Sequence, residues 1–127
     1  MKYYFNKTLD ISFDEAIQKV TNELQKEGFG ILTVIDVKET LKKKLDVEFR
    51  PYKILGACNP GFAYQALQTE PHIGTMLPCN VIVQDTGSVV EVAAVDPKAS
   101  MAAVENPELE GVANQVQDLL KKIIERL

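Results

Sequence analysis

The segment with the strongest consequence for the fold is residues 79–95, CNVIVQDTGSVVEVAAV. Two runs rich in β-branched residues, 79–85 and 88–95, are separated by Thr86-Gly87, a pattern typical of a β-hairpin. The second run is apolar on both faces of the predicted strand, because side chains alternate along a strand. One face carries Val89, Ala93 and Val95, and the other carries Val90, Val92 and Ala94.

A helix with well-marked ends is predicted upstream of this hairpin. Ser12 and Glu15 have the spacing of a capping box, which places the start of the helix at Ser12. Gly28 supplies the left-handed residue that follows a helix, and Phe29 can then contact Leu24 as a Schellman motif requires.

The other elements follow from periodicity and from Pro, Gly and Asn positions. Strands are expected at 2–9, 30–37 and 51–58, a short surface helix or irregular excursion at 38–45, a helix at 60–69, a connecting segment at 71–78, a helical turn after Asp96-Pro97 and a long final helix from Asn106-Pro107. The order is β-α-β-(α)-β-α-β-β-α. With no repeat or linker, this predicts a single α+β domain spanning residues 1–127.

Composition indicates a soluble globular protein, with 46% hydrophobic and 25% charged residues. The net charge of −4 disfavours a nucleic-acid partner, and Lys42-Lys43-Lys44 reads as a solvated helix face because acidic residues surround it. No segment approaches the roughly 20 apolar residues of a membrane span, and the first residues lack a signal-like apolar run. We therefore expect a cytoplasmic protein without a membrane or nucleic-acid partner.

The apolar character of both sheet faces predicts a partner. Two main helices can cover one face of such a sheet but hardly both, so we expect a homodimer formed through an apolar sheet face. A small ligand between sheet and helix is a further option, and the sequence does not identify it.

Three segments, YKILGACNPGFAYQAL, IGTMLPCNVIV and VAAVDP, resemble the signature of the domain-of-unknown-function 302 family. The matching positions are Cys58, Asn59, Pro60, Ala63, Leu67, Leu77, Pro78, Cys79, Asp96 and Pro97. The resemblance implies a fold similar to the TATA-binding-protein-like class: a curved, mainly antiparallel sheet of about five strands with two main helices packed on one face. It carries no established activity, substrate or cofactor, and function belongs to sites rather than to folds.

Cys58 and Cys79 are the residues with the greatest chemical potential. If strands 51–58 and 79–85 are antiparallel, as the resemblance favours, both cysteines lie at the same rim of the sheet. Asn59 and Pro60 suit the N-cap and the first position of helix 60–69. Cys58 then lies beside the N-terminus of that helix, which stabilises a thiolate.

Several interpretations of the pair remain open. Inert core thiols are the first expectation, because free cysteine is often buried; a soft-metal site of Cys58, Cys79 and His72, or a redox pair with Cys79 as resolving thiol, are the alternatives. A structural disulfide is not expected in the cytoplasm. The candidate ligand-binding or redox residues are Cys58, Asn59, His72, Cys79 and Asn80.

No phosphate-binding glycine loop or nucleophile-elbow motif occurs. Catalysis and cofactors therefore remain unknown from the sequence, and Glu91, a mid-strand carboxylate, is expected to be exposed at a sheet edge. The prediction is a small dimeric binding or interaction module, with a thiol-based metal-binding or redox site as the alternative.

Overall fold

The computed structural model describes residues 2–127, which form five strands joined by helical segments. The strands are β1 (Tyr4–Leu9), β2 (Gly30–Asp36), β3 (Tyr52–Cys58), β4 (Cys79–Asp85) and β5 (Val90–Val95). The helices are α1 (Phe13–Lys26), α2 (Val37–Leu45), α3 (Pro60–Thr69), α4 (Pro97–Ser100) and α5 (Glu110–Glu125), with 3₁₀ helices η1 (Pro71–Met76) and η2 (Pro107–Leu109). The order of elements is the predicted α+β order. The segment 38–45, expected as a short helix or an irregular excursion, is helical.

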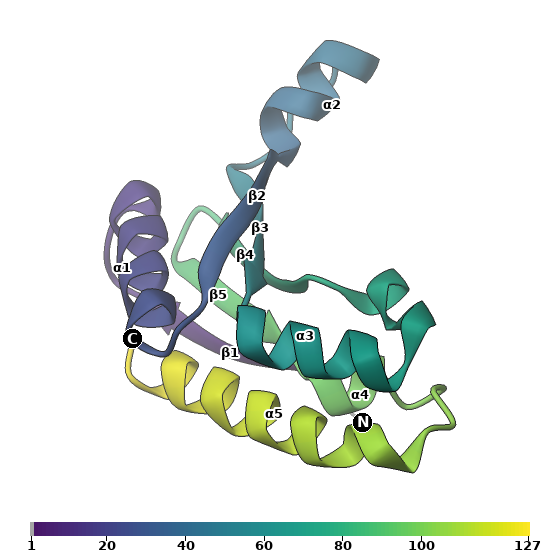
Figure 1. The fold of residues 1–127 in the computed structure, drawn as a ribbon. Coiled ribbons are helices and arrows are strands. Elements are labelled where there is room, and N and C mark those ends of the chain that lie inside the picture. Colours follow the sequence, from purple (N-terminus) through teal and green to yellow (C-terminus); the bar gives the residue numbers. More distant parts are fainter. Residues whose placement is uncertain (1) are drawn as a thin grey trace.

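The strands form one antiparallel sheet in the order β1-β5-β4-β3-β2 (Figure 1). The hairpin expected at Thr86-Gly87 is confirmed as the β4–β5 pair, although β5 begins at Val90 rather than at residue 88. β1 and β2 are the edge strands. These two strands precede and follow α1 in the chain, but they lie at opposite edges of the sheet.

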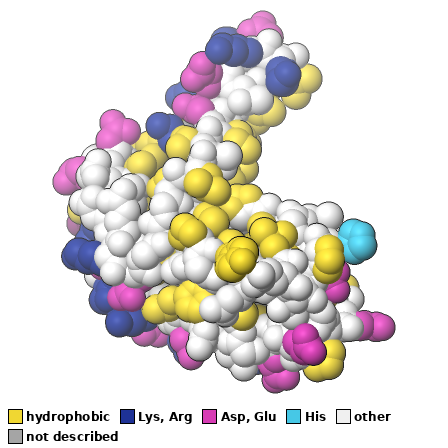
Figure 2. Space-filling model, in the orientation of Figure 1, with side chains coloured by type: hydrophobic (Ala, Val, Ile, Leu, Met, Phe, Trp, Pro, Cys, Tyr) yellow, Lys and Arg dark blue, Asp and Glu magenta, His cyan; other side chains and the backbone are white. Residues whose placement is uncertain are grey.

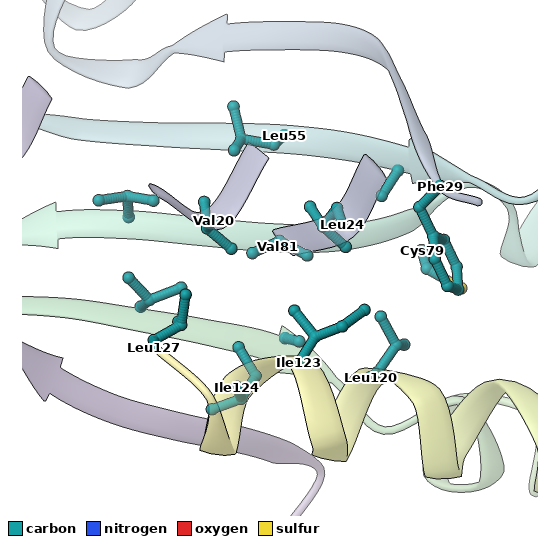
Figure 3. Packing of buried hydrophobic residues seen from close by; sticks show 14 of the residues in the cluster. Val20, Leu24, Phe29, Leu55, Cys79, Val81, Leu120, Ile123, Ile124 and Leu127 are labelled. Atoms are coloured by element: carbon teal, nitrogen blue, oxygen red, sulfur yellow. The ribbon is translucent and has the colours of Figure 1, made fainter. Parts of the chain in front are cut away.

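The main core lies between one face of the sheet and helices α1 and α5 (Figure 3). Val20 and Leu24 of α1 and Leu120 of α5 are fully buried against sheet residues such as Val81 and Val92. Burying each of these side chains contributes roughly 1.5–3 kcal/mol. The amphipathic stripes of the two helices therefore cover this face, as the sequence predicts.

Both ends of α1 have the predicted capping contacts. The Ser12 hydroxyl accepts a hydrogen bond from the Glu15 amide at 3.1 Å, and the Glu15 carboxylate accepts one from the Ser12 amide at 3.4 Å. Gly28 has a φ of 84°, and the Phe29 amide donates to the Leu24 carbonyl at 3.0 Å. The Schellman end therefore turns the chain so that the buried Phe29 ring enters the core.

Each of the two Asn-Pro pairs begins a helical segment and also binds the end of another helix, although Asn106 caps the 3₁₀ helix η2 and the predicted final helix, α5, begins only at Glu110. The Asn59 carboxamide oxygen accepts from the Phe62 amide at 3.4 Å, while its nitrogen donates to the Glu27 carbonyl just after α1 at 3.3 Å. In the same way, Asn106 donates to the Thr69 carbonyl at the end of α3 at 3.0 Å. These side chains therefore fix the positions of successive helices as well as starting them.

The helix α2 is the part of the fold that packs least. Asp36 caps it by accepting from the Glu39 amide at 2.9 Å, but none of its residues is buried. Figure 1 shows α2 projecting from the body at the far end of β2 and β3. The segment 37–50 therefore forms an arm outside the main core.

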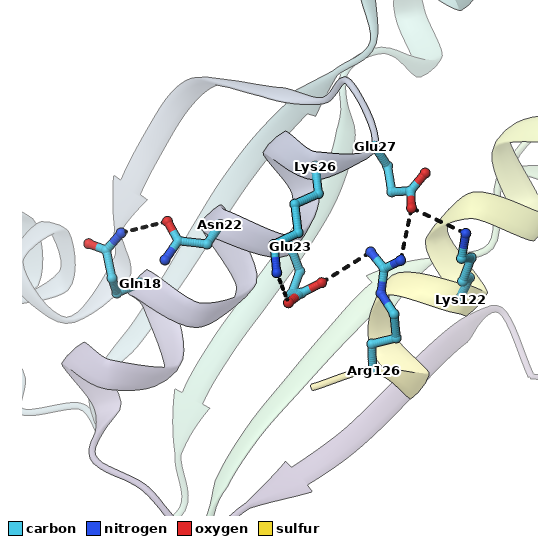
Figure 4. A network of polar contacts seen from close by, with 7 residues as sticks. All are labelled: Gln18, Asn22, Glu23, Lys26, Glu27, Lys122 and Arg126. Carbon is cyan, nitrogen blue, oxygen red and sulfur yellow. Dashed lines mark hydrogen bonds and ion pairs between the residues drawn. The ribbon is translucent and has the colours of Figure 1, made fainter.

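A small ion-pair network joins α1 to the end of α5 (Figure 4). The Arg126 guanidinium lies 3.1 Å from the Glu23 carboxylate and 2.9 Å from that of Glu27. Hydrogen bonding to Lys26 is the main cause that lowers the pKa of Glu23, and hydrogen bonding to Arg126 is the main cause that lowers the pKa of Glu27. The network therefore stabilises the fold only while both carboxylates are ionised.

Replacing Arg126 with Gln should lower the melting temperature at pH 7 and have little effect at pH 3. The folded-state pKa values of Glu23 and Glu27 are depressed, so their stabilisation is present above the usual carboxyl pKa of 4.5 and is lost as the pH falls. Thermal unfolding at the two pH values measures this, with Lys121→Gln as a control of equal charge change. An equal loss at both pH values would contradict it.

Gly56 lies in β3 at a point where two side chains, from Thr33 and Pro78, come close to the backbone. A Cβ built at this position would collide with the side chains of Thr33 and Pro78, whereas one built at Gly30 in adjacent β2 meets nothing within 4 Å. Gly56→Ala should therefore destabilise the protein by about 1–3 kcal/mol through overpacking. Urea unfolding checks this against Gly30→Ala, and similar losses in both variants would show that the collision is not the cause.

Candidate functional site

The antiparallel arrangement of β3 and β4 brings the two cysteines to the same edge of the sheet. Ala57 of β3 pairs with Cys79, the first residue of β4, and Cys58 is the next residue along β3. The antiparallel pairing predicted for these strands is thus confirmed. Both thiols are free.

Cys58 and Cys79 line one small cavity of about 40 Å³ between the sheet end and helices α3 and α5. Its other walls are mainly apolar and include Phe29, Phe62 and Val116. Figure 3 shows Cys79 beside the Phe29 ring. The cavity is far smaller than the roughly 300–1,000 Å³ of drug-sized ligand pockets, so it suits a very small apolar group rather than a large ligand.

Cys79 is the more deeply buried of the two thiols, with 8% of its surface exposed. Burial, followed by the effect of nearby Cys58, raises the pKa of Cys79 from 9.0 to about 11. At neutral pH its thiol is therefore protonated, and a protonated thiol is a poor nucleophile. Cys79 behaves as part of the core.

Cys58 is partly exposed and lies directly before the N-cap of α3. The neighbouring Asn59 also lines the cavity, but both ends of its carboxamide are engaged, with the Phe62 amide and the Glu27 carbonyl. Asn59 thus holds the start of α3 against the residue that follows α1. Of the pair, Cys58 is the thiol that reagents can reach.

The remaining predicted residues lie elsewhere. His72 is on the surface in η1, with 92% of its side chain exposed and its Nδ1 atom 3.5 Å from the Glu70 carboxylate. Asn80 is exposed and lines a hollow on the helix-free face of the sheet. Within residues 2–127 no three His, Cys, Asp or Glu side chains are grouped so that they could hold a metal ion. Of the candidate residues, Cys58, Asn59 and Cys79 therefore line the cysteine cavity, and His72 and Asn80 do not.

The helix-free face carries a polar cluster that the sequence analysis did not identify as a site. Glu91 lies in β5, which pairs with both β1 and β4, so the expectation of a carboxylate at a sheet edge is wrong. Its oxygens accept hydrogen bonds from Gln84 Nε2 at 2.7 Å and Asn6 Nδ2 at 2.9 Å. The sequence did show Glu91 as a mid-strand carboxylate among apolar residues. It did not show the strand order, which is needed to place Glu91 in an inner strand.

A third surface feature is the apolar edge at β2. We call Leu32, Val34 and Ile35 the β2 edge patch; they are 67%, 56% and 47% exposed. Figure 2 shows hydrophobic side chains gathered in a band over α2, β2 and the adjoining part of α3. Leu45 and Val47 of the arm are exposed as well, so the apolar surface predicted for the sheet is concentrated at this edge.

The family model for the domain of unknown function DUF302 matches residues 5–127. The chain belongs to the DUF302 family. A similar solved structure is the crystal structure of an uncharacterized conserved DUF302 protein from Bacillus stearothermophilus, with a TM-score of 0.92 and 25% sequence identity. The match covers 99% of this chain and 98% of the other. No curated protein matches the sequence.

The family relationship confirms the resemblance and the fold, and it names no activity for either protein. In the part of the chain that the structure describes, none of the helices has the length and apolar character needed to cross a lipid bilayer.

Thiol labelling should distinguish the two cysteines. At pH 7.5 we expect a thiol reagent to modify Cys58 in the folded protein and Cys79 only after unfolding, because Cys79 is buried and its pKa is raised to about 11. Mass spectrometry of the Cys58→Ser and Cys79→Ser variants measures the two rates separately. Rapid labelling of Cys79 in folded Cys58→Ser protein would contradict this assignment.

Proposed function

We propose that this protein is a small homodimeric interaction module in which the β2 edge patch and the arm pack against a second copy of the chain. The observation that carries the proposal is the concentration of exposed apolar side chains on an edge strand whose outer side has no neighbouring strand. Exposed apolar surface of this kind marks interaction sites in soluble proteins.

The β2 edge strand has little protection against pairing along most of its length. Its residues, GILTVID, include no proline, the only charged residue is Asp36 at the end, and the one irregularity is a register shift between Ile31 and Thr33. Edge strands with few charges and no proline can pair with another strand. The other edge, β1, contains Lys7 within the strand. The apolar patch thus lies on the less charged part of an edge strand.

The apolar side chains lie on both faces of β2, so a sheet partner fits better than a helix alone. Val34 pairs with Leu55, a core residue, and so belongs to the helix-covered face, while Ile35 pairs with Ile54 on the opposite face. A second β2 strand in antiparallel orientation would cover both sides at once. A two-fold axis produces such a self-complementary contact.

The arm carries charges of both signs. Residues 37–50 hold five basic and three acidic residues, a net charge of +2, and Lys42 and Lys43 are already paired with acidic residues of the same arm. Charged groups of both signs are therefore present on each of two arms that meet at a two-fold contact, so charge does not by itself select the partner.

Replacing Val34 with Lys should convert the dimer into a monomer. A charge at the centre of the β2 edge patch would be buried without a partner, and we expect at least a tenfold increase in the dimer dissociation constant, or about 1.4 kcal/mol. Analytical ultracentrifugation measures this, with Val89→Lys in the β4–β5 turn as the matched control. A monomeric wild-type protein at micromolar concentration would refute the proposal.

A thiol-based function is the second candidate, and the shared cavity of Cys58 and Cys79 is the observation that favours it. Two free cysteines suit a reducing, cytoplasmic compartment. Oxidation by a disulfide reagent would form a bond between the two sulfurs and break the S–S bond of the reagent, which takes up the two electrons and two protons and leaves as two thiols. Elemental analysis of protein purified without chelator tests the metal version of this site, and a metal-free, unreactive pair would leave only the structural role.

A further inference from the structure

The helix-free face of the sheet contains a hollow of about 440 Å³. Its rim includes Tyr3, Tyr4 and Tyr52, and Glu91 and Gln84 lie within it beside apolar residues such as Ile82. We call this the Glu91 hollow. Its volume falls within the roughly 300–1,000 Å³ of small-molecule sites, and none of its lining residues belongs to the β2 edge patch.

The Glu91 carboxylate is held in place by two amide groups. Gln84, its cross-strand partner in β4, donates to Oε1 at 2.7 Å, and Asn6 of β1 donates to Oε2 at 2.9 Å. Glu91 takes part in none of the ion pairs of residues 2–127. The carboxylate is therefore contacted directly by neutral donors, and the cations Lys2 and Arg50 lie on the far side of those amides.

The amide oxygens of Asn6 and Gln84, which point away from Glu91, each accept a hydrogen bond from a cation. Lys2 Nζ donates to Asn6 Oδ1 at 2.7 Å, and Arg50 Nε donates to Gln84 Oε1 at 2.8 Å. Because each amide oxygen accepts from a cation, each amide nitrogen is directed towards Glu91. The two cations lie one side chain further out, and the carboxylate remains between them.

The same rim already shows that its aromatic rings interact with cations. Lys2 Nζ lies 5.1 Å from the centre of the Tyr4 ring, and Arg50 Cζ lies 5.6 Å from the centre of the Tyr52 ring. Cations near tyrosine faces at such distances are attracted by the ring quadrupole. A carboxylate within a tyrosine-lined hollow is the combination that recognises an organic ammonium group.

We propose that the Glu91 hollow binds a small organic cation, with its ammonium group on the Glu91 carboxylate and its apolar part against the tyrosine rims and Ile82. The carboxylate provides the charge complementarity, and the amides on either side keep it oriented in the absence of ligand. None of the residues that line this hollow belongs to β2, although Arg50, which holds Gln84, is the last residue of the arm.

Phenethylammonium is a suitable probe, and phenylacetate is its control, with the same ring and the opposite charge. In two-dimensional NMR titrations of the wild-type protein, we expect saturable shifts of amides in β1, β4 and β5 with phenethylammonium and none with phenylacetate. Equal binding of the two probes, or no saturation by phenethylammonium at about 10 mM, would overturn the proposal without any variant being needed.

Glu91→Gln removes the charge at nearly constant volume and should weaken phenethylammonium binding at least tenfold. Asp118→Asn is the matched control, since Asp118 is an exposed carboxylate on α5, on the other side of the sheet. Circular dichroism checks that both variants fold. Unchanged affinity in folded Glu91→Gln protein would show that the carboxylate is not the anchor. Repeating the titration with Val34→Lys separates this site from dimerisation.

Discussion

The rest of the structure depends on the packing of one sheet face against α1 and α5. Val20, Leu24 and Leu120 are fully buried there, and the sheet supplies Val81 and Val92 to the same cluster. A five-stranded sheet has two faces, and the helices of this chain cover only one of them. The environments of Cys79 and Glu91 follow from that asymmetry, because Cys79 lies under the helices and is buried, whereas Glu91 lies on the helix-free face and stays partly exposed.

Cys79 and Glu91 show how the two faces of the sheet differ. Cys79 points into the covered side, where burial raises the pKa of its thiol to about 11 and leaves a packed, unreactive group. Glu91 lies on the uncovered side, where two amides orient its carboxylate in an open hollow. The cysteines attract attention in the sequence, but the carboxylate has the environment that can recognise a ligand.

Local signals in the sequence predicted most of the fold correctly. The Ser12 cap, the Gly28 ending, the Asn59-Pro60 start of α3 and the Thr86-Gly87 hairpin all depend on contacts within a few residues, and Asn106-Pro107 starts the 3₁₀ helix that leads into α5. Such contacts survive in almost any tertiary setting, and so short patterns predict them. The common location of Cys58 and Cys79 required one further assumption, that β3 and β4 are antiparallel, which the structure confirms.

What the sequence determined by itself was the set of helices and strands, their caps and turns, and the excess of apolar surface over what two helices can cover. Tertiary structure alone decided the strand order, which puts Glu91 in an inner strand, Asn80 on the helix-free face and His72 far out on η1. It also decided that α2 would project from the body and leave the β2 edge uncovered. The physical reason is that capping and periodicity act between near neighbours, whereas strand order depends on burial summed over the whole chain.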